Sequence, residues 1–409
     1  MTKNEFYREA RRDLDGPLHG VRVLDVTTSW AGPMAACVLA DLGAEVIKIE
    51  APVGEVIRRL PPFLPGTNPP LGFGQVTVNR NKQNLTLELR APEGREIFLK
   101  LAATADVVIE NFRAGTLAKW GVGYQDVRKV KPDIVYVSIT GWGQWGRDHD
   151  RVGYDPMAQA ASGFISLNGP ADGDPVKAPT FLCDDLAGLH GAIGALAALR
   201  HRDETGEGQH IDVALLDAML FQSNGYPTLG AMGIGMPRWG NQFGISVPTN
   251  VFKCRDGSVL MGTLLDTHWK ELARMCGRPE LADDPEFATL PGRARNRDQC
   301  NAMVAGFCAG RTVEEVVGQS ARHSIPCAPV RSYEEAARDP HVLERDMLVQ
   351  VEQQDGSVAP ITGPAAKFSR TPTRIRFGAR ALGADNDSVL EELGYDAPAR
   401  DALREKKII

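Results

Sequence analysis

The first 140 residues alternate short runs of β-branched and apolar residues with longer stretches of helical periodicity. Such runs, separated by helices, predict a parallel sheet covered by helices, because parallel strands need long crossover connections. Strands are expected at Val21–Val26, Glu45–Ile49, Leu85–Leu89, Val107–Glu110 and Ile134–Ile139. Between the first two, Thr27–Pro33 forms a sharp turn, with Pro33 suited to the first turn of a helix. This predicts a Rossmann-like βαβ unit without the GxGxxG pattern of dinucleotide binding.

The remaining sequence divides into regions of different composition. The stretch 218–248 is rich in Gly, Met and Pro and is expected to be a linker. It is followed by a smaller α/β domain, which opens with a hairpin signal around Asp256-Gly257. The expected organisation is a large domain beginning with 1–217, a linker at 218–248, a small α/β domain at 249–335 and a final segment at 336–409.

Composition excludes several functional classes. The 409 residues are 43% hydrophobic and 24% charged, which is ordinary for a soluble globular protein with more than one domain. A formal net charge of −6 argues against a nucleic-acid partner. No run approaches the ~20 apolar residues of a membrane span, and the charged Met1–Arg12 lacks a signal-peptide core. We expect a cytoplasmic protein without membrane contact and, since the eight histidines show no ligand spacing, without a metal.

Two adjacent carboxylates, Asp184 and Asp185, precede a helix expected at about 185–203. Small residues recur at helical spacing over Gly188–Leu199, so this helix can approach its neighbours closely. Asp is a preferred N-cap residue, and on spacing alone a capping role is favoured. The functional interpretation is that the positive end of the helix lowers the pKa of a carboxylate that acts as a nucleophile.

Several motifs in order give this chain a family resemblance. Asp184–Gly188, the Ala-rich helix, Thr205–Gln209 and the strand-like Ile211–Asp217 together resemble the class III CoA-transferases. Further similar stretches are Gly20–Asp25, Ala31–Pro33, Leu42–Glu50, Asn81–Lys82, Glu110–Phe112 and Gly141–Gln144. The resemblance implies that 336–409 returns to the large domain and that two chains interlock, as a homodimer or as a heteromer with a homologous subunit.

The resemblance also implies a reaction. CoA would move from an acyl-CoA donor, expected to be succinyl-CoA, to a carboxylic acid through an aspartyl-CoA thioester. The nucleophile of the family lies four residues before the glycine of the helix, which is Asp184 here, with Asp185 as the alternative. The thiol of Cys183 is a less favoured nucleophile, because cysteine commonly fills small apolar sites. The CoA thioester is a substrate, and no permanently bound cofactor is expected.

For CoA itself, the resemblance points to Ala31, Asn111, Phe112 and Lys119. Arg58, on the Pro-rich loop Ala51–Leu71, is expected to supply charge for the CoA phosphates, with Arg59 beside it. Without the resemblance, Asn111 is a turn residue and the basic side chains are solvated charges.

For the acid substrate, the expected contacts are Trp30, Trp142, Tyr154, Gly240 and Gln242. The last two lie in Trp239–Gly244, which loosely resembles the glycine-rich loop of the family. Tryptophans on the loops predicted to border the site indicate that it accommodates a bulky or aromatic acid. We therefore expect an arylsuccinate or another dicarboxylate as acceptor.

Two other functions are weighed against this one. An α-methylacyl-CoA racemase would need a second acid/base group, typically His, where this chain has Tyr154; a tyrosine with an ordinary pKa near 10 is a poor proton acceptor at neutral pH. A non-catalytic subunit of a heteromeric CoA-transferase could have lost the aspartate that this chain retains.

Overall fold

In the computed structural model, which describes residues 1–67 and 70–409, the chain forms two compact units. The first comprises Met1–Phe164, Ala178–Ala231 and Pro340–Ile409, and the second Ile165–Lys177 and Met232–Asp339. These bounds differ from the expected domains: 165–177 belongs to the second unit, and the expected linker is divided between the two. Residues 68 and 69 of the expected Pro-rich loop lie outside the described residues.

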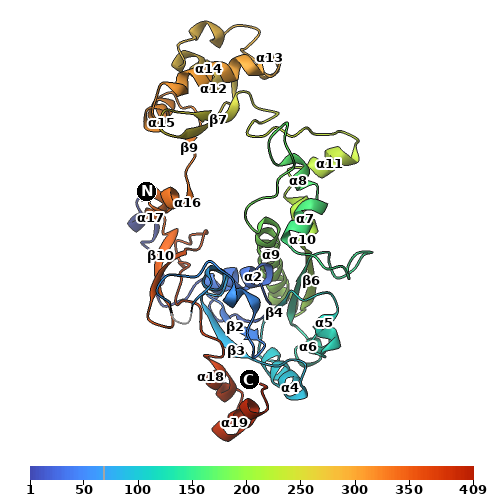
Figure 1. Cartoon of the computed structure of the whole chain (residues 1–409). Coiled ribbons are helices and arrows are strands. Elements are labelled where there is room, and N and C mark those ends of the chain that lie inside the picture. The colour runs from blue at the N-terminus through green and yellow to red at the C-terminus, as the bar shows by residue number, and fades with distance from the viewer. Residues whose placement is uncertain (68–69) are drawn as a thin grey trace. The chain divides into compact units, whose positions relative to one another are not determined.

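A six-stranded parallel sheet forms the centre of the first unit, as the α/β prediction required (Figure 1). Its order is β3-β2-β1-β4-β5-β6, so the chain runs outward from β1 in one direction and then from β4 in the other. The strands are β1 Arg22–Val26, β2 Glu45–Glu50, β3 Lys82–Thr86, β4 Val107–Glu110, β5 Val135–Thr140 and β6 Gln209–Ala214. Between β1 and β4, this order leaves a crevice at the carboxyl ends of the strands, where open α/β sheets bind ligands.

Both faces of the sheet are covered, because successive strand residues point to opposite sides. Val23 contributes to the core shared with α2 (Ala31–Asp41) and α9 (Leu182–Thr205). Leu24 contributes to the opposite core, shared with α4 (Pro92–Ala102) and the C-terminal helices. The other helices of this unit are α1 Lys3–Phe6, η1 Val56–Arg59, α3 Phe73–Val78, α4 Pro92–Ala102, α5 Thr116–Lys119, α6 Tyr124–Val130, α7 Asp155–Ala161, α10 Leu215–Phe221, α11 Tyr226–Ala231, α17 Pro340–Glu344, α18 Asn386–Glu392 and α19 Ala397–Glu405.

The third strand lies three residues earlier than expected. The expectation of Leu85–Leu89 followed apolar residues, whereas β3 begins at the buried Lys82. The Nζ atom of Lys82 donates to Oδ2 of Asp25 on β1 at 2.7 Å, so an ion pair replaces apolar packing at this position. A hydrophobic pattern cannot identify a buried charge whose partner lies 57 residues away.

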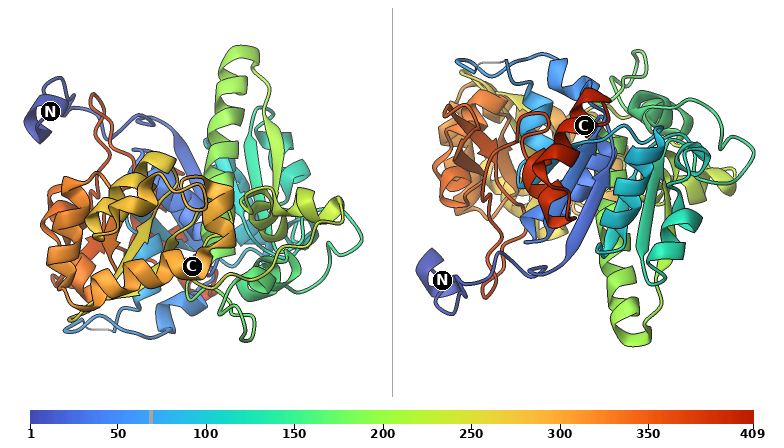
Figure 2. Two further views of the ribbon diagram at one scale, coloured as in Figure 1. Left: turned by 90° about the horizontal axis from the view of Figure 1, so that it is seen from above. Right: turned by 90° about the horizontal axis from the view of Figure 1, so that it is seen from below.

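The C-terminal segment lies along the outer edge of this sheet (Figure 2). Asn84 and Thr86 on β3 donate backbone N–H groups to the side chains of Asp385 and Asn386, both at 2.8 Å. The edge strand is therefore covered rather than left open to another chain. Two strands of the same segment, β10 Leu348–Glu352 and β11 Val358–Thr362, pair as an antiparallel hairpin.

The second unit is built on a three-stranded antiparallel sheet, with the expected hairpin at its start. Its strands are β7 Thr249–Lys253, β8 Ser258–Gly262 and β9 Cys327–Pro329. Its main helices are α12 Asp266–Met275, α13 Leu290–Arg295, α14 Arg297–Ala309, α15 Val313–Arg322 and α16 Tyr333–Ala337, with the short η2 at Pro279–Ala282, while α8 (Phe164–Leu167) begins at the boundary of the first unit. The apolar side chains of this unit form a core of their own.

Helix α9 packs closely against α2, as its small residues predicted. A Cβ atom on Gly188 would lie 2.8 Å from the carbonyl oxygen of Ala31. One on Gly191 would lie 2.7 Å from Ile139 of β5. By length and composition alone α9 is also long and apolar enough to cross a membrane, contrary to the expectation that no segment is, but a core helix passes the same test.

This packing predicts that Gly188→Ala lowers the free energy of unfolding by about 1–3 kcal/mol, because backbone and Met34 lie too close to the new methyl group. Gly194→Ala is the control within the same helix, since the three atoms nearest to its Cβ position all belong to the side chain of Ile211, with one methyl at 3.0 Å and the other two atoms at 3.9 Å. The gain in helix propensity, about 1 kcal/mol, offsets that contact. Urea denaturation of both variants measures the difference; equal stabilities would contradict the close packing of α9 on α2.

Candidate active site

A cavity of about 450 Å³ lies at the carboxyl ends of β1, β4 and β5. Its walls come from the segments that follow these strands and from the start of α9. It is thus at the crevice created by the strand order. The cavity brings together seven of the residues selected from the sequence: Trp30, Ala31, Asn111, Phe112, Trp142, Tyr154 and Asp184.

The N-terminus of α9 is capped by a carboxylate that the sequence did not indicate. Neither Asp184 nor Asp185 is the N-cap, which is Phe181, so the capping interpretation is wrong. Instead, Oδ1 of the buried Asp155, at the start of α7, accepts hydrogen bonds from the N–H groups of Cys183 at 2.6 Å and Asp184 at 3.4 Å. Gln159 donates to the other oxygen of Asp155 at 2.6 Å. Two free amides of the first turn are therefore satisfied without the side chain of Asp184.

Asp184 has a raised pKa, not the lowered pKa that a position at the helix start predicts. Burial, followed by the charges of Asp155 and Asp185, raises the pKa of Asp184 to about 7. The positive end of the helix is already occupied by another carboxylate, so the loss of water has the larger effect. Because the folded protein holds this proton more tightly than the unfolded chain, ionising Asp184 costs stability as the pH rises from about 4 to about 7.

The neighbours of Asp184 are less suited to act as nucleophiles. Oδ1 of Asp185 accepts a hydrogen bond from Nε1 of Trp30 at 2.7 Å, and Asp185 is not among the described residues that line the cavity. Cys183 is fully buried, and burial raises the pKa of its thiol to about 12. A thiol with that pKa stays protonated near neutral pH, so it is a weak nucleophile.

The segments after β1 and β4 are joined by the side chain of Asn111. Its Oδ1 accepts from the N–H of Thr28 at 2.8 Å, and its Nδ2 donates to the carbonyl of Thr28 at 2.7 Å. The amide that was expected to contact CoA therefore fixes the shape of the cavity. Similarly, the buried Glu110 accepts from the N–H of Phe112 at 2.8 Å, and burial raises the pKa of Glu110 to about 7.

The basic residues at the cavity are not those selected from the sequence. Arg58 donates from Nη2 and Nε to both carboxylate oxygens of Glu50, at 2.6 and 2.8 Å, so binding a phosphate would break this ion pair. Lys119 is exposed at the end of α5 and is not among the described residues that line the cavity. The cavity is lined instead by Arg113, His149 and Arg151. These three belong to turns without a motif, and no pattern in the sequence distinguishes them from solvated charges.

Aromatic rings form much of the cavity wall. The guanidinium of Arg151 lies 5.1 Å from the ring of Trp142, a favourable cation–π arrangement. A Cβ atom on Gly153 would lie 2.5 Å from Nε1 of Trp142, so only glycine leaves space for this indole. Tyr154 precedes α7 and exposes 64% of its surface.

Gly240 and Gln242 belong to the second unit and remain predicted contacts. The Oε1 atom of Gln242 accepts from Arg297 at 3.3 Å and from Asn301 at 3.2 Å, and Gly240 has a positive φ of 62°. The loop is therefore anchored to α14. Among the residues the structure describes, no group of three or more His, Cys, Asp or Glu side chains is placed to hold a metal ion.

Known proteins are similar to this chain in both sequence and structure. The family described as CoA-transferase family III matches residues 18–386. A succinyl-CoA:mesaconate CoA-transferase of Haloarcula marismortui is 36% identical over 93% of this chain and 97% of its own. A succinate–glutarate CoA-transferase of Agrobacterium fabrum is 36% identical over 92% and 96%. The crystal structure of a CAIB/BAIF family protein from Brucella suis is similar, with a TM-score of 0.82, 32% identity and coverage of 93% and 100%.

The geometry predicts that Asp155→Asn lowers the pKa of Asp184 from its value of about 7, because the charge next to Asp184 disappears while one oxygen remains to cap α9. A titration of the aspartate carboxyl carbons by 13C NMR measures this pKa. Asp217→Asn is the control, since Asp217 lies on α10 and is not among the charges that act on Asp184. An unchanged pKa in Asp155→Asn would contradict the electrostatic coupling.

Proposed function

The chain belongs to CoA-transferase family III, and we propose that it moves CoA from succinyl-CoA to a dicarboxylic acid by covalent catalysis at Asp184. The transfer of CoA is the activity of the family; the donor, the acceptor and the aspartyl intermediate are the proposal. One observation supports Asp184 above all. Of the described residues that line the cavity, it is the only one with a carboxylate.

The proposed reaction exchanges one thioester for another in four balanced steps. The Asp184 carboxylate attacks the carbonyl of succinyl-CoA, which forms a mixed anhydride and releases CoA thiolate. The thiolate attacks the aspartyl carbonyl, which forms aspartyl-CoA thioester and releases succinate. The acceptor carboxylate then attacks this thioester, and the thiolate released attacks the acceptor side of the new anhydride. The product is an acyl-CoA with Asp184 regenerated, and splitting the exchange makes each step easier.

The surroundings of Asp184 favour these steps. A carboxylate with a pKa of about 7 is a stronger base than an ordinary aspartate, and near neutral pH a large fraction of it is ionised. Each step places negative charge on a carbonyl oxygen. The first turn of α2 begins at Ala31 in the cavity wall and has no side-chain cap, so its amides and helix dipole can stabilise that charge.

The cavity also supports the choice of a dicarboxylate. Mesaconate and glutarate, in the names of two relatives, are both dicarboxylic acids. Arg113 and Arg151 supply positive charge for the second carboxylate or for the CoA phosphates. Trp30, Phe112 and Trp142 add apolar surface, so we include arylsuccinates among the proposed acceptors.

Asp184→Asn is expected to reduce kcat for CoA transfer by at least about a thousandfold, because an amide cannot form the anhydride. Asp185→Asn, the matched control, keeps an oxygen to accept from Trp30 and removes one of the charges that raise the pKa of Asp184, so it should reduce kcat by about tenfold or less. Wild-type protein incubated with succinyl-CoA and then hydroxylamine should carry a hydroxamate at Asp184 in peptide mass mapping. A hydroxamate at Asp185, or an active Asp184→Asn protein, would contradict the proposal.

An acceptor panel tests the substrate class. With succinyl-CoA as donor, mesaconate, glutarate and benzylsuccinate should accept CoA, whereas formate and acetate should not, because they lack a second carboxylate for the basic residues of the cavity. Arg151→Gln should lower kcat/KM for the dicarboxylates by about 10–100-fold, because it removes a guanidinium proposed to pair with the second carboxylate. Efficient transfer to formate together with none to benzylsuccinate would exclude the arylsuccinate proposal.

A further inference from the structure

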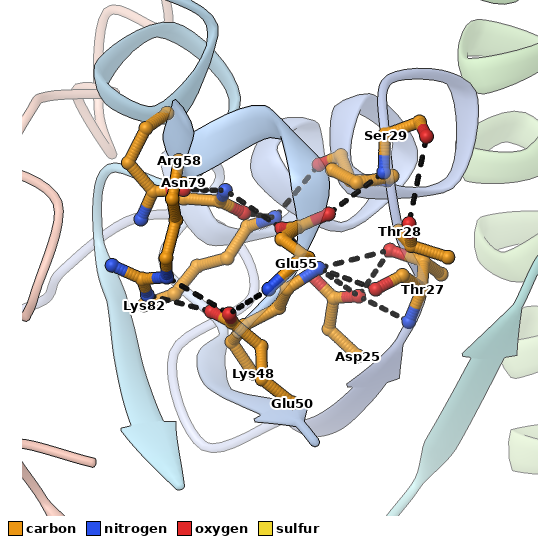
Figure 3. Close-up of polar contacts among 12 residues, drawn as sticks. Asp25, Thr27, Thr28, Ser29, Lys48, Glu50, Glu55, Arg58, Asn79 and Lys82 are labelled. Carbon is orange, nitrogen blue, oxygen red and sulfur yellow. Dashed lines mark hydrogen bonds and ion pairs between the residues drawn. The ribbon is translucent and has the colours of Figure 1, made fainter. Parts of the chain in front are cut away.

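A network of buried charges lies beneath the loop that joins β1 to α2 (Figure 3). Lys48 of β2 donates from Nζ to the carbonyl of Thr27 at 2.6 Å. Lys82 of β3 donates to the carbonyl of Pro33 at 2.8 Å. Asp25 pairs with both lysines, with its oxygens 3.6 Å from Nζ of Lys48 and 2.7 Å from Nζ of Lys82. The start of the loop that borders the cavity and the first turn of α2 are thus held by buried lysines.

The middle of the same loop is held by Glu55. Its Oε2 accepts a hydrogen bond from the N–H of Ser29 at 2.7 Å. Its Oε1 lies 3.1 Å from Nζ of Lys48 and 3.4 Å from Nδ2 of Asn79. Figure 3 shows the carboxylate of Glu55 between Ser29 and Lys48. The carboxylate therefore receives donors on both oxygens, which an amide of the same shape cannot do.

Ser29 needs such a contact because its backbone is strained. It has a φ of +66°, in the left-handed region that residues other than glycine rarely adopt. Such conformations persist where neighbouring groups hold them, and they occur often at functional sites. Ser29 itself lines the cavity and is followed by Trp30, which bonds to Asp185, and by Ala31 at the start of α2.

We propose that Glu55 is a positioning residue for CoA transfer, which holds Ser29 in its left-handed conformation and so sets Trp30 and the first turn of α2 against the cavity. Glu55 acts only through the backbone of Ser29, and it is not among the described residues that line the cavity. The inference deepens the proposed function, because it concerns the same cavity as Asp184. Its test compares variants in one transfer assay and does not require that Asp184 be the nucleophile.

Glu55→Gln is the informative variant. An amide has one oxygen where the carboxylate has two. Placing its NH2 group against the ammonium of Lys48 costs more than placing it against a backbone N–H, so the oxygen turns to Lys48 and the N–H of Ser29 loses its acceptor. We expect kcat/KM for transfer from succinyl-CoA to the best acceptor to fall about tenfold, since a strained residue of this kind requires stabilisation. We also expect a lower melting temperature, because Lys48 loses a charged partner.

Replacing Ser29 with glycine separates positioning from stability. Glycine adopts a positive φ at no steric cost, so Ser29→Gly should restore kcat/KM of Glu55→Gln to within about threefold of Ser29→Gly alone. The melting temperature should stay low, because glycine does not replace the partner of Lys48. Ser29→Ala removes the same hydroxyl without easing the backbone and should not restore activity.

Asp41→Asn provides a control for damage to a buried ion pair. Asp41 pairs with Arg80 at 2.6 Å and is as buried as Glu55, but it makes no contact with Ser29. It should lower the melting temperature and leave kcat/KM within about threefold of wild type. The proposal is overturned if Ser29→Gly fails to restore the Glu55→Gln protein, if Ser29→Ala restores it equally well, or if Asp41→Asn loses as much activity as Glu55→Gln.

Discussion

The placement of Asp155 at the N-terminus of α9 determines the chemistry of the carboxylate beside it. Asp155 accepts hydrogen bonds from the backbone N–H groups of Cys183 and Asp184. The side chain of Asp184 therefore does not cap the helix, and it lines the cavity instead. Burial, followed by the charges of Asp155 and Asp185, then raises the pKa of Asp184 to about 7. A helix start that would ordinarily acidify an aspartate here holds a more basic one, which suits a nucleophile that must attack a thioester near neutral pH.

The same principle recurs around the cavity, because buried polar side chains at the carboxyl end of the sheet hold the backbone that forms its walls. Glu110 accepts from Phe112, Asn111 exchanges two hydrogen bonds with Thr28, and Glu55 accepts from Ser29. Each of these groups lies at or beyond the end of a strand or in the connection that follows it. Since a buried charge needs a partner, the network also ties β1, β2 and β3 together through Asp25, Lys48 and Lys82.

Local patterns predicted much of this architecture and little of its electrostatics. Four of the five expected strands and the long helix lie where apolar periodicity placed them, because their packing is decided by the local sequence. The strand at Lys82 was displaced because its charge is neutralised by Asp25, far away in sequence. Arg58 was selected as a phosphate ligand because the family resemblance places a basic residue near this position, and its partner Glu50 became evident only in the fold. The capping role of Asp155 likewise depends on a contact 28 residues away, which no spacing rule encodes.

The most direct test of the account follows oxygen through the reaction. When the acceptor acid carries 18O in its carboxylates, attack on the aspartyl thioester and the subsequent release leave one acceptor oxygen in the enzyme carboxylate. After turnover with labelled glutarate and succinyl-CoA, fragmentation of the peptide containing Asp184 and Asp185 should place the 18O on Asp184. Label on Asp185, or turnover that leaves no label in the protein, would contradict the central claim that Asp184 carries the acyl group.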